Sequence, residues 1–328
     1  MEQEQEQRSE RDILTNLPFV SASEDRPYDF GVQLDGRFLF WNARLDKASR
    51  GLRTLKRRVN TWVTGLSFLT TLVLFVLFIV SAVVLSTPDA WMELAFWTRP
   101  SVTQLWLWLS VAALLYTIYR RALTKREPKE TGDRKMHEVT ATYTTWEAAK
   151  DMKHAAWVNI PDHCASGTWR ALDDAAELAE TFKHPYVSLL HIFAGVLAQP
   201  SVGHVFARLG LTFDTIRAPL ARKLQTLPQA DKGQALAARI DPLGQRTILG
   251  AAVHAAMQGR RVVTPVDLFV SAFDNSPFLS ELFYDAGVED DAMQNVLAWL
   301  KIREEMRARW QAFSKASFLK PKNNMNRA

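Results

Sequence analysis

The chain of 328 residues has few of the features that mark small secreted or fibrous proteins. It has one cysteine, Cys164, which excludes an intramolecular disulfide framework and fits a reducing compartment. With 14 glycines, 14 prolines, 48% hydrophobic and 23% charged residues, it is neither collagen-like nor disordered as a whole. Its net charge of +5 is small, so the placement of the charges matters more than their sum.

Charge is missing altogether from two apolar runs, residues 62–85 and 102–119. The 24 residues of the first run, at about 1.5 Å each, make roughly 36 Å of helix, enough to cross a hydrocarbon core of ~30 Å. The second run is shorter, and it carries Trp and Tyr residues that suit interfacial depths. We therefore expect two transmembrane helices joined by an extracytoplasmic loop, residues 86–101, rather than a buried hairpin of a soluble core.

Basic residues flank the two runs and are scarce between them. Those before the first run are Arg37, Arg44, Lys47, Arg50, Arg53, Lys56, Arg57 and Arg58, and those after the second are Arg120, Arg121, Lys125, Arg126, Lys129, Arg134 and Lys135. The connecting loop carries only Asp89, Glu93 and Arg99. Because Lys and Arg are retained on the cytoplasmic side during insertion, we expect both termini in the cytoplasm and a hairpin in the inner (cytoplasmic) membrane of a bacterium.

The remaining segments around the hairpin are predicted from composition. Residues 1–36 form an acidic, disordered tail, and residues 120–165 form a cytosolic linker. Residues 37–61 form a basic juxtamembrane segment that either lies on anionic lipid headgroups or serves only to set the orientation. No aromatic interleaving or reading motif supports nucleic-acid binding.

Residues 166–310 carry helical patterns and an internal repeat. The order helix, short extended loop, helix, helix, glycine turn and helix occurs twice, about 76 residues apart. Helix starts are predicted at Asp241-Pro242, Thr264-Pro265 and Ser276-Pro277, and helix ends at Gly210 and Gly287. Neither copy has enough apolar surface for a core of its own, so we expect one all-α, pseudo-twofold bundle of two four-helix repeats.

The two copies resemble the Clp N-terminal repeat domain, which stands in front of the ATPase modules of Clp-type AAA+ unfoldases. The residues that carry the resemblance are Ala175–Ala179, His184-Pro185-Tyr186-Val187, His191 and Leu209-Gly210 in the first copy, and Val263-Thr264-Pro265, Asp267-Leu268-Phe269 and Ala286-Gly287-Val288 in the second. The resemblance covers residues 171–300. It implies a domain that recognises protein substrates or adaptors and that works with Clp-type ATPase or peptidase subunits in chaperoning and proteolysis.

The resemblance also places a candidate peptide or adaptor groove at the starts of the second helices. Its residues are Tyr186, Leu190, His191, Arg261, Val266 and Asp267. In the family a Thr-Glu-His sequence commonly opens these helices, and some relatives use the glutamates to hold phosphorylated arginine. Leu190 and Val266 stand at the glutamate positions here. An aliphatic side chain cannot pair with a guanidinium group, so the resemblance implies a more apolar groove.

Nothing in the sequence indicates catalysis or a bound cofactor. The phosphate-binding pattern Gly-x4-Gly-Lys-Ser/Thr does not occur in the 328 residues. His154, Asp162, His163 and Cys164 match no standard zinc spacing. We expect His184 and His191 to bond the backbone at a helix start, and Asp267 to reinforce the cap formed by Thr264. Residues 311–328 are predicted to be a linker or tail.

Two questions stay open at this level. The chain is either the front part of a longer membrane-bound Clp-like ATPase or a free-standing anchored N-domain, and its charged final helix favours the first. The alternative function is a membrane-tethered scaffold or regulator unrelated to proteolysis. Transport has little support because neither run contains a charge, although a channel formed by several copies is a further possibility.

Overall fold

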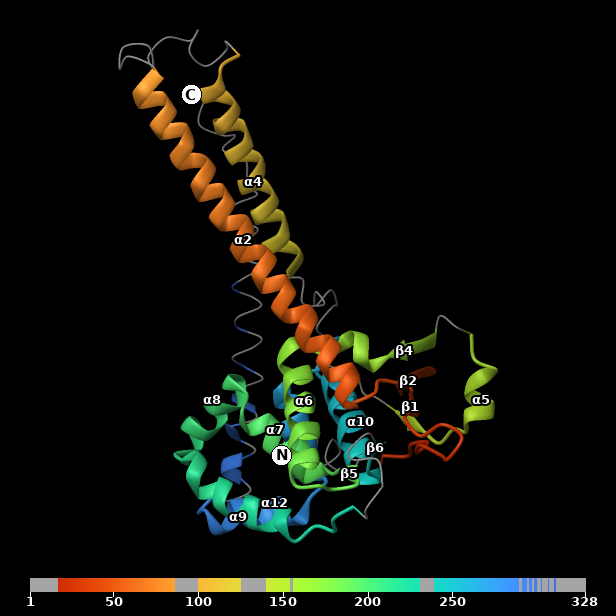
Figure 1. Ribbon diagram of the computed structural model, residues 1–328. Helices are drawn as coiled ribbons and strands as arrows, with labels where there is room; N and C mark the ends of the chain where they lie inside the picture. Colours follow the sequence, from red (N-terminus) through yellow and green to blue (C-terminus); the bar gives the residue numbers. More distant parts are fainter. Residues whose placement is uncertain are drawn as a thin grey trace, which may run out of the picture. The chain divides into compact units, whose positions relative to one another are not determined.

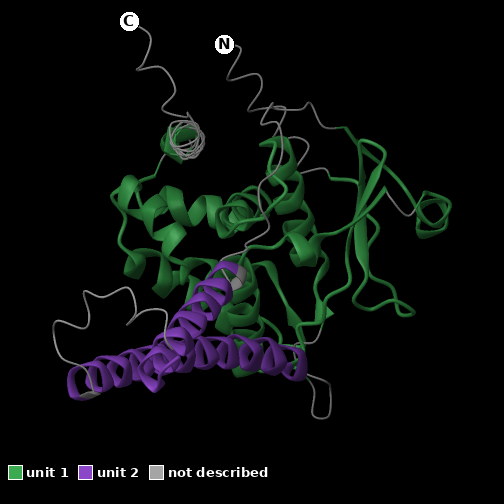
Figure 2. Cartoon of the chain, turned by 90° about the horizontal axis from the view of Figure 1, so that it is seen from above, with its two compact units in different colours: residues 1–46, 130–328 green, residues 47–129 purple. Residues whose placement is uncertain are grey.

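The computed structural model describes residues 17–85, 100–124, 140–153, 156–230 and 239–288, together with part of 291–310. The chain divides into two compact units (Figure 2). Residues 47–129 form the smaller unit, and the segments on either side of it, 1–46 and 130–328, form the larger one.

The smaller unit is a pair of helices, α2 (Lys47–Leu85) and α4 (Val102–Thr124), which pack along each other (Figure 1). Both are long and apolar enough to cross a membrane. Their contact includes a polar pair, Ser67 Oγ and Thr117 Oγ1, which lie 2.6 Å apart. Most large apolar side chains of α2 are exposed instead. The predicted spans 62–85 and 102–119 lie within these helices, and most of the predicted loop 86–101 lies outside the described residues.

The larger unit contains a four-stranded sheet that the sequence analysis did not predict. The hairpin of β1 (Phe30–Leu34) and β2 (Arg37–Trp41) turns at Asp35-Gly36 and is antiparallel. β3 (Ala141–Thr142) pairs with β1, and β4 (Trp157–Asn159) pairs with β2, which gives the order β3-β1-β2-β4. The chain before the helix pair and the chain after it therefore share one sheet.

The structure of these segments corrects two predictions. The expected disordered tail 1–36 is wrong for β1, whereas the expected basic segment 37–61 comprises β2 and the first part of α2. The expected linker 120–165 instead contains β3, α5 (Trp146–Lys150), β4 and the short 3-10 helix η3 (Ile160–His163). The fold is therefore mostly helical but not all-α. Residues 1–16, 125–139 and 311–328 lie outside the described residues.

The rest of the larger unit repeats one order of elements. The first copy comprises α6 (Ser166–Thr181), β5 (Tyr186–Val187), α7 (Leu189–Leu197), α8 (Pro200–Leu209) and α9 (Phe213–Gln225). The second begins after β6 (Arg239–Ile240) and comprises α10 (Pro242–Met257), α11 (Pro265–Asp274) and α12 (Pro277–Asp285). The described positions between 291 and 310 are helical too. The predicted helix starts at Pro242, Pro265 and Pro277 are confirmed.

Both copies contribute to one core. The rings of Phe193 on α7 and Phe269 on α11, which occupy equivalent positions in the two copies, stack with centroids 5.6 Å apart. Phe206 and Phe283 meet the same pair edge-on or tilted. Each of these four side chains is buried, and such burial contributes about 2–3 kcal/mol per ring. The shared core explains why neither copy needs a core of its own.

The sheet packs against the helical repeats within the larger unit. The rings of Trp41 on β2 and Trp169 on α6 have centroids 5.5 Å apart. The Ala22 N–H donates to Gln245 Oε1 on α10 at 3.0 Å. The guanidinium of Arg246, also on α10, lies over the ring of Phe19 at 5.6 Å. The sheet, together with the segment before β1, is thus an added layer on the first helices of both repeats.

Candidate functional site

The two repeats are joined by a pair of reciprocal strand contacts. In the first junction (residues 184–191 with 239–241), β5 runs parallel to β6 and Val187 pairs with Ile240. In the second junction (residues 260–267 with 163–165), Val263 forms a parallel bridge with Cys164. Each junction therefore joins the segment leading into one repeat's second helix to the segment leading into the other repeat's first helix. The candidate groove residues all belong to these two junctions.

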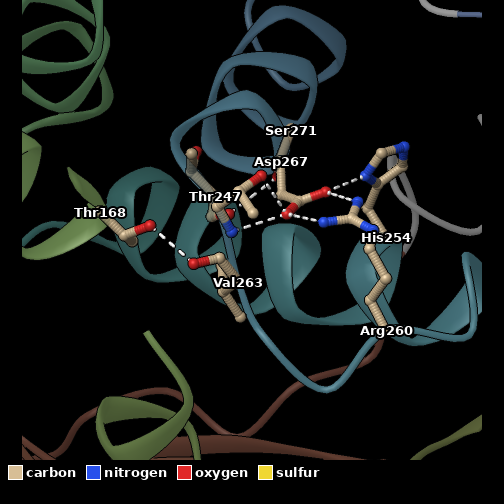
Figure 3. A network of polar contacts seen from close by, with 8 residues as sticks. Thr168, Thr247, His254, Arg260, Val263, Asp267 and Ser271 are labelled. Carbon is tan, nitrogen blue, oxygen red and sulfur yellow. Dashed lines mark hydrogen bonds and ion pairs between the residues drawn. The ribbon is translucent and has the colours of Figure 1, made fainter. Parts of the chain in front are cut away.

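The second junction is built around one buried carboxylate, that of Asp267 (Figure 3). Its Oδ2 accepts hydrogen bonds from the Thr264 N–H and hydroxyl, both at 2.7 Å, and from Arg260 Nη1 at 2.9 Å. Its Oδ1 accepts from His254 Nδ1 at 2.6 Å and from Arg260 Nη2. The expected reinforcement of the Thr264 cap is confirmed, because Thr264 and Asp267 form a capping box.

The charge of Asp267 is stabilised by its partners. Burial alone raises the pKa of this carboxyl, but the Arg260 guanidinium and the His254 hydrogen bond lower it further than burial raises it. The pKa of Asp267 therefore lies well below its usual range. A buried ion whose acceptor sites are all occupied fixes a helix start, and it offers no lone pair to a ligand.

The first junction has an imidazole at the equivalent place. The Nδ1 atom of His191 accepts from the Ser188 N–H at 3.0 Å and lies 2.7 Å from the Ser188 hydroxyl. A backbone N–H can only donate, so Nδ1 carries no proton and the ring is neutral. Its Nε2–H therefore donates to Nδ1 of His184, 2.8 Å away. Burial, with a smaller contribution from His184, lowers the pKa of His191 to about 4. The expected backbone bonding at a helix start is confirmed for His191.

The predicted groove is only partly open. Leu190, His191 and Asp267 are buried, so the structure contradicts the expectation that they face a ligand. They face inward because the first turns of α7 and α11 pack against neighbouring helices of the bundle. Tyr186 is 45% exposed, Arg261 is exposed and Val266 is half-buried. These three side chains remain available to a partner.

One exposed residue beside the first junction was not predicted from the sequence. Leu243, in the first turn of α10, is 49% exposed, and it lies three residues after β6, which pairs with β5 at Tyr186. An apolar residue just after a predicted Asp-Pro helix start was a usable signal, since the first turn of a helix is commonly solvated. We refer to Tyr186, Leu243, Arg261 and Val266 as the helix-start residues.

The remaining candidate chemistry is inert or undescribed. Cys164 is buried, and its surroundings raise the pKa of its thiol to about 12, chiefly by burial and then through the charges of Asp162 and Asp267. A thiol so seldom ionised is a poor nucleophile. Within the described residues, no three His, Cys, Asp or Glu side chains gather as metal ligands. His154 of the imagined metal set lies outside the described residues.

Comparison with known proteins identifies the repeats. Residues 165–286 match the family model of the Clp repeat (R) N-terminal domain. This part of the chain is a Clp N-terminal domain. Its bounds run from just before α6 to just after α12, so they contain the first junction and all of the second except residues 163 and 164.

Solved structures with similar chains include the Hsp104 N-terminal domain from Candida albicans, at 14% identity and a TM-score of 0.37, covering 40% of this chain and 87% of that one. Another comes from a malarial protein secretion system, also at 14% identity and a TM-score of 0.37, covering 42% of this chain and 95% of that one. No curated protein sequence has a significant match to the chain.

Proposed function

We propose that the chain is a membrane-anchored recognition subunit that receives protein substrates or adaptors for a Clp-type chaperone or protease. The observation that carries the proposal is the Clp N-terminal domain at residues 165–286, whose junctions keep their polar groups buried and present exposed side chains at the helix starts. Such a surface suits protein contact. Its ionisable groups are occupied in holding the fold together, which supports recognition rather than catalysis in this part of the chain.

The anchoring part of the proposal rests on the helix pair and on its flanks. Both helices are long and apolar enough to span a bilayer. The strands before the pair, β1 and β2, form one sheet with β3 and β4 after it. One folded sheet cannot lie on two sides of a membrane, so both flanks share a side. The basic residues next to the spans favour the cytoplasm for that side.

We also propose that the two repeats are related by a pseudo-twofold axis. Val187–Ile240 and Cys164–Val263 are the same contact with the repeats exchanged, since each residue of the first repeat has its counterpart 76 positions later. The N–H of Ala165 donates to the Val263 carbonyl at 2.9 Å, and that of Asp241 donates to the Val187 carbonyl at 3.1 Å. Reciprocal contacts of this kind support a twofold relation.

We propose that the ATPase activity of the Clp-type system is supplied by a longer parent chain or by a separate Clp-type subunit, to which this domain delivers its cargo. The basic residues Arg53, Arg57, Arg58, Arg120 and Arg121 stand at one end of the helix pair, and we propose that they contact anionic headgroups there.

Affinity capture of the full chain from solubilised membranes tests the recognition function. Proteins bound to the unmodified chain are compared with those bound to Tyr186→Ser/Arg261→Glu/Val266→Ser. The matched control is Tyr284→Ser, which removes a 72% exposed ring from α12. We expect Clp-type ATPase, peptidase or adaptor proteins with the unmodified chain and the control, and their loss with the triple variant. Partners unrelated to Clp systems would instead support the scaffold function.

A labelling experiment tests the anchoring separately. Single cysteines are placed at Glu24, Ser101 and Asp285, which are exposed, in a chain whose own thiol is buried. A membrane-impermeant maleimide applied from outside intact cells should label Ser101→Cys alone, and the other two only after permeabilisation. Labelling of Glu24→Cys or Asp285→Cys in intact cells would contradict the proposed topology.

A further inference from the structure

The first junction contains two buried histidines whose ring nitrogens accept hydrogen bonds that protonation would break. His184 and His191 are both buried, and their rings meet at 2.8 Å between Nδ1 of the first and Nε2 of the second. Phe182 stacks on His184 with an interplanar angle of 9°. The two imidazoles contact each other, Ser188 and this ring, and none of these partners is an acid.

Both open proton sites of the pair are hydrogen-bond acceptors. The Nδ1 atom of His191 accepts the Ser188 N–H that begins α7, and the Nδ1 atom of His184 accepts the Nε2–H of His191. A proton added to His191 turns its acceptor into a donor facing a second donor, and the bond from the Ser188 N–H, one half of the capping box of α7, is lost. A proton added to His184 sets two N–H groups against each other in the same way. Either protonation therefore breaks a bond within residues 184–191, the segment that carries β5 and the start of α7 into the junction.

The charged surroundings of the pair are few. The buried or half-buried titratable groups on the elements packed against α7 are Asp173, Asp174 and Glu180 on α6, Arg246 and His254 on α10 with Asp241 at its N-cap, and Asp267 and Asp274 on α11. None of these is bonded to either imidazole. Asp241 acts on the junction directly, because its carboxylate accepts from the Gly244 N–H at 2.6 Å and the Leu189 N–H, at the start of α7, helps to lower its pKa.

Protonation of Asp241 has the opposite effect on the junction to protonation of the histidines. Burial, partly offset by its backbone hydrogen bonds, raises the pKa of Asp241 to about 6 from 3.8. The closed junction therefore takes up this proton more readily than an opened one, and protonation of Asp241 favours closure as the pH falls. The pKa of His191 is shifted the other way, from 6.5 to about 4, and burial lowers that of His184 too. Imidazole protonation hence favours opening between about pH 6.5 and pH 4.

The second junction lacks this sensitivity. Its central group, Asp267, is ionised and bound to Arg260, and its pKa lies below the usual carboxyl range. The stability that it contributes is present above about pH 4 and is lost only as the pH falls further. Mild acid therefore destabilises the first junction and leaves the second one closed.

We propose that the first junction is an acid-sensitive latch, in which protonation of His184 and His191 at Nδ1 releases the start of α7 and the β5–β6 pair while the second junction stays closed. The latch is independent of the proposed function, since its opening is a property of the chain without a partner. Tyr186 lies on β5, so an open latch also displaces one helix-start residue.

Amide hydrogen exchange of the full chain in detergent micelles tests the latch. Opening is compared at pH 8 and pH 5 for peptides covering 182–197 and 259–274, after correction for the intrinsic pH dependence of exchange. The lowered pKa of His191 alone raises the opening equilibrium constant about 30-fold at pH 5, and the raised pKa of Asp241 lowers that constant by a factor of about ten. We expect the first peptide to open at least about threefold more at pH 5 and the second to change less than twofold.

Three variants isolate the titrating groups. Asp241→Asn keeps a side chain suited to the N-cap and should raise the acid response of the first peptide to about 30-fold or more. In the Asp241→Asn chain, a further His191→Gln substitution keeps a residue suited to the capping box. It should remove the factor of about 30 from the acid response of the first peptide. His204→Gln removes an exposed imidazole on α8 and should leave the response unchanged.

Two hydrogen-exchange results would overturn the latch. One is an equal acid response of both peptides in the unmodified chain. The other is an unchanged response after His191→Gln in the Asp241→Asn chain. Histidine NMR of the unmodified chain gives an independent reading, in which a His191 ring that becomes protonated near pH 6 without any opening also contradicts the proposal.

Discussion

His191 and Asp267 occupy the same place in the two repeats, the third position of the second helix, and each accepts from the residue that caps that helix. Around His191 the junction is neutral, with a second imidazole seven residues earlier. Around Asp267 it is ionic, with Arg260 at the corresponding place. The comparison teaches that the fold uses a hydrogen-bond acceptor at this position, which can be neutral or charged. The neutral imidazole stops accepting when mild acid protonates it, whereas the carboxylate does not.

A second pair of equivalent positions differs in packing. On α7, Gly195 lies so close to α6 that an added Cβ would stand 2.1 Å from the Ala171 carbonyl oxygen. Its counterpart on α11 is Ser271, whose hydroxyl donates to the Thr247 carbonyl at 2.8 Å. The second and first helices therefore approach more closely in the first repeat than in the second, although the same carbonyl position is contacted in both.

The largest expected effect comes from breaking the ionic junction. Arg260→Ala leaves the Asp267 carboxylate buried without its main partner, which should lower the free energy of unfolding by about 3–5 kcal/mol. Urea unfolding of the full chain in micelles, followed by near-UV circular dichroism, measures it. The control is Arg261→Ala, an exposed neighbour, expected to change the value by less than about 0.5 kcal/mol. Equal effects of the two variants would show that the ionic network contributes little.

An intermediate effect is expected from exchanging the packing residues. Gly195→Ser places in the first repeat the residue that the second repeat already has, but the Ala171 carbonyl leaves no room for its Cβ. We expect a loss of about 1–3 kcal/mol in the same unfolding measurement. The reverse exchange, Ser271→Gly, forfeits one hydrogen bond and should cost about 1 kcal/mol. A Gly195→Ser variant as stable as the unmodified chain would mean that the two helix pairs are equally spaced.

The smallest effect concerns the turn before each junction. Lys183 has φ 60° and its counterpart Gly259 has φ 66°, a backbone region that costs a residue with a Cβ about 1–2 kcal/mol. Lys183→Gly should therefore raise the free energy of unfolding by up to about 1 kcal/mol, after the greater flexibility of glycine in the unfolded chain is subtracted. Gly259→Lys should lower it by about 1 kcal/mol. Shifts of the same sign for both exchanges contradict this account.

The sequence predicted the helical repeats because their signals are local. Proline after a capping residue at Pro242, Pro265 and Pro277 fixes the helix starts, and copies 76 residues apart fix the order of the elements. The uncharged runs predicted the long apolar helices for the same reason. The roles of His191 and Asp267 as caps followed from their position three residues after Ser188 and Thr264.

The sheet escaped prediction although one of its signals is strong. Asp35-Gly36 between alternating apolar residues is typical of a hairpin, but the basic residues nearby favoured a juxtamembrane segment instead. The partners β3 and β4 lie beyond the helix pair, roughly a hundred residues later, and no local pattern connects such distant strands. The buried state of Leu190 depends likewise on packing between helices, which periodicity alone does not assign.

Site-specific photo-crosslinking in native membranes tests the central claim, recognition at the helix starts of the Clp N-terminal domain, most directly. A photoreactive amino acid is placed at Tyr186 in the full chain and, for comparison, at the exposed Tyr284. The account predicts adducts with Clp-type ATPase, adaptor or substrate proteins from position 186 and not from position 284. The same adducts from both positions, or none from position 186, would contradict it.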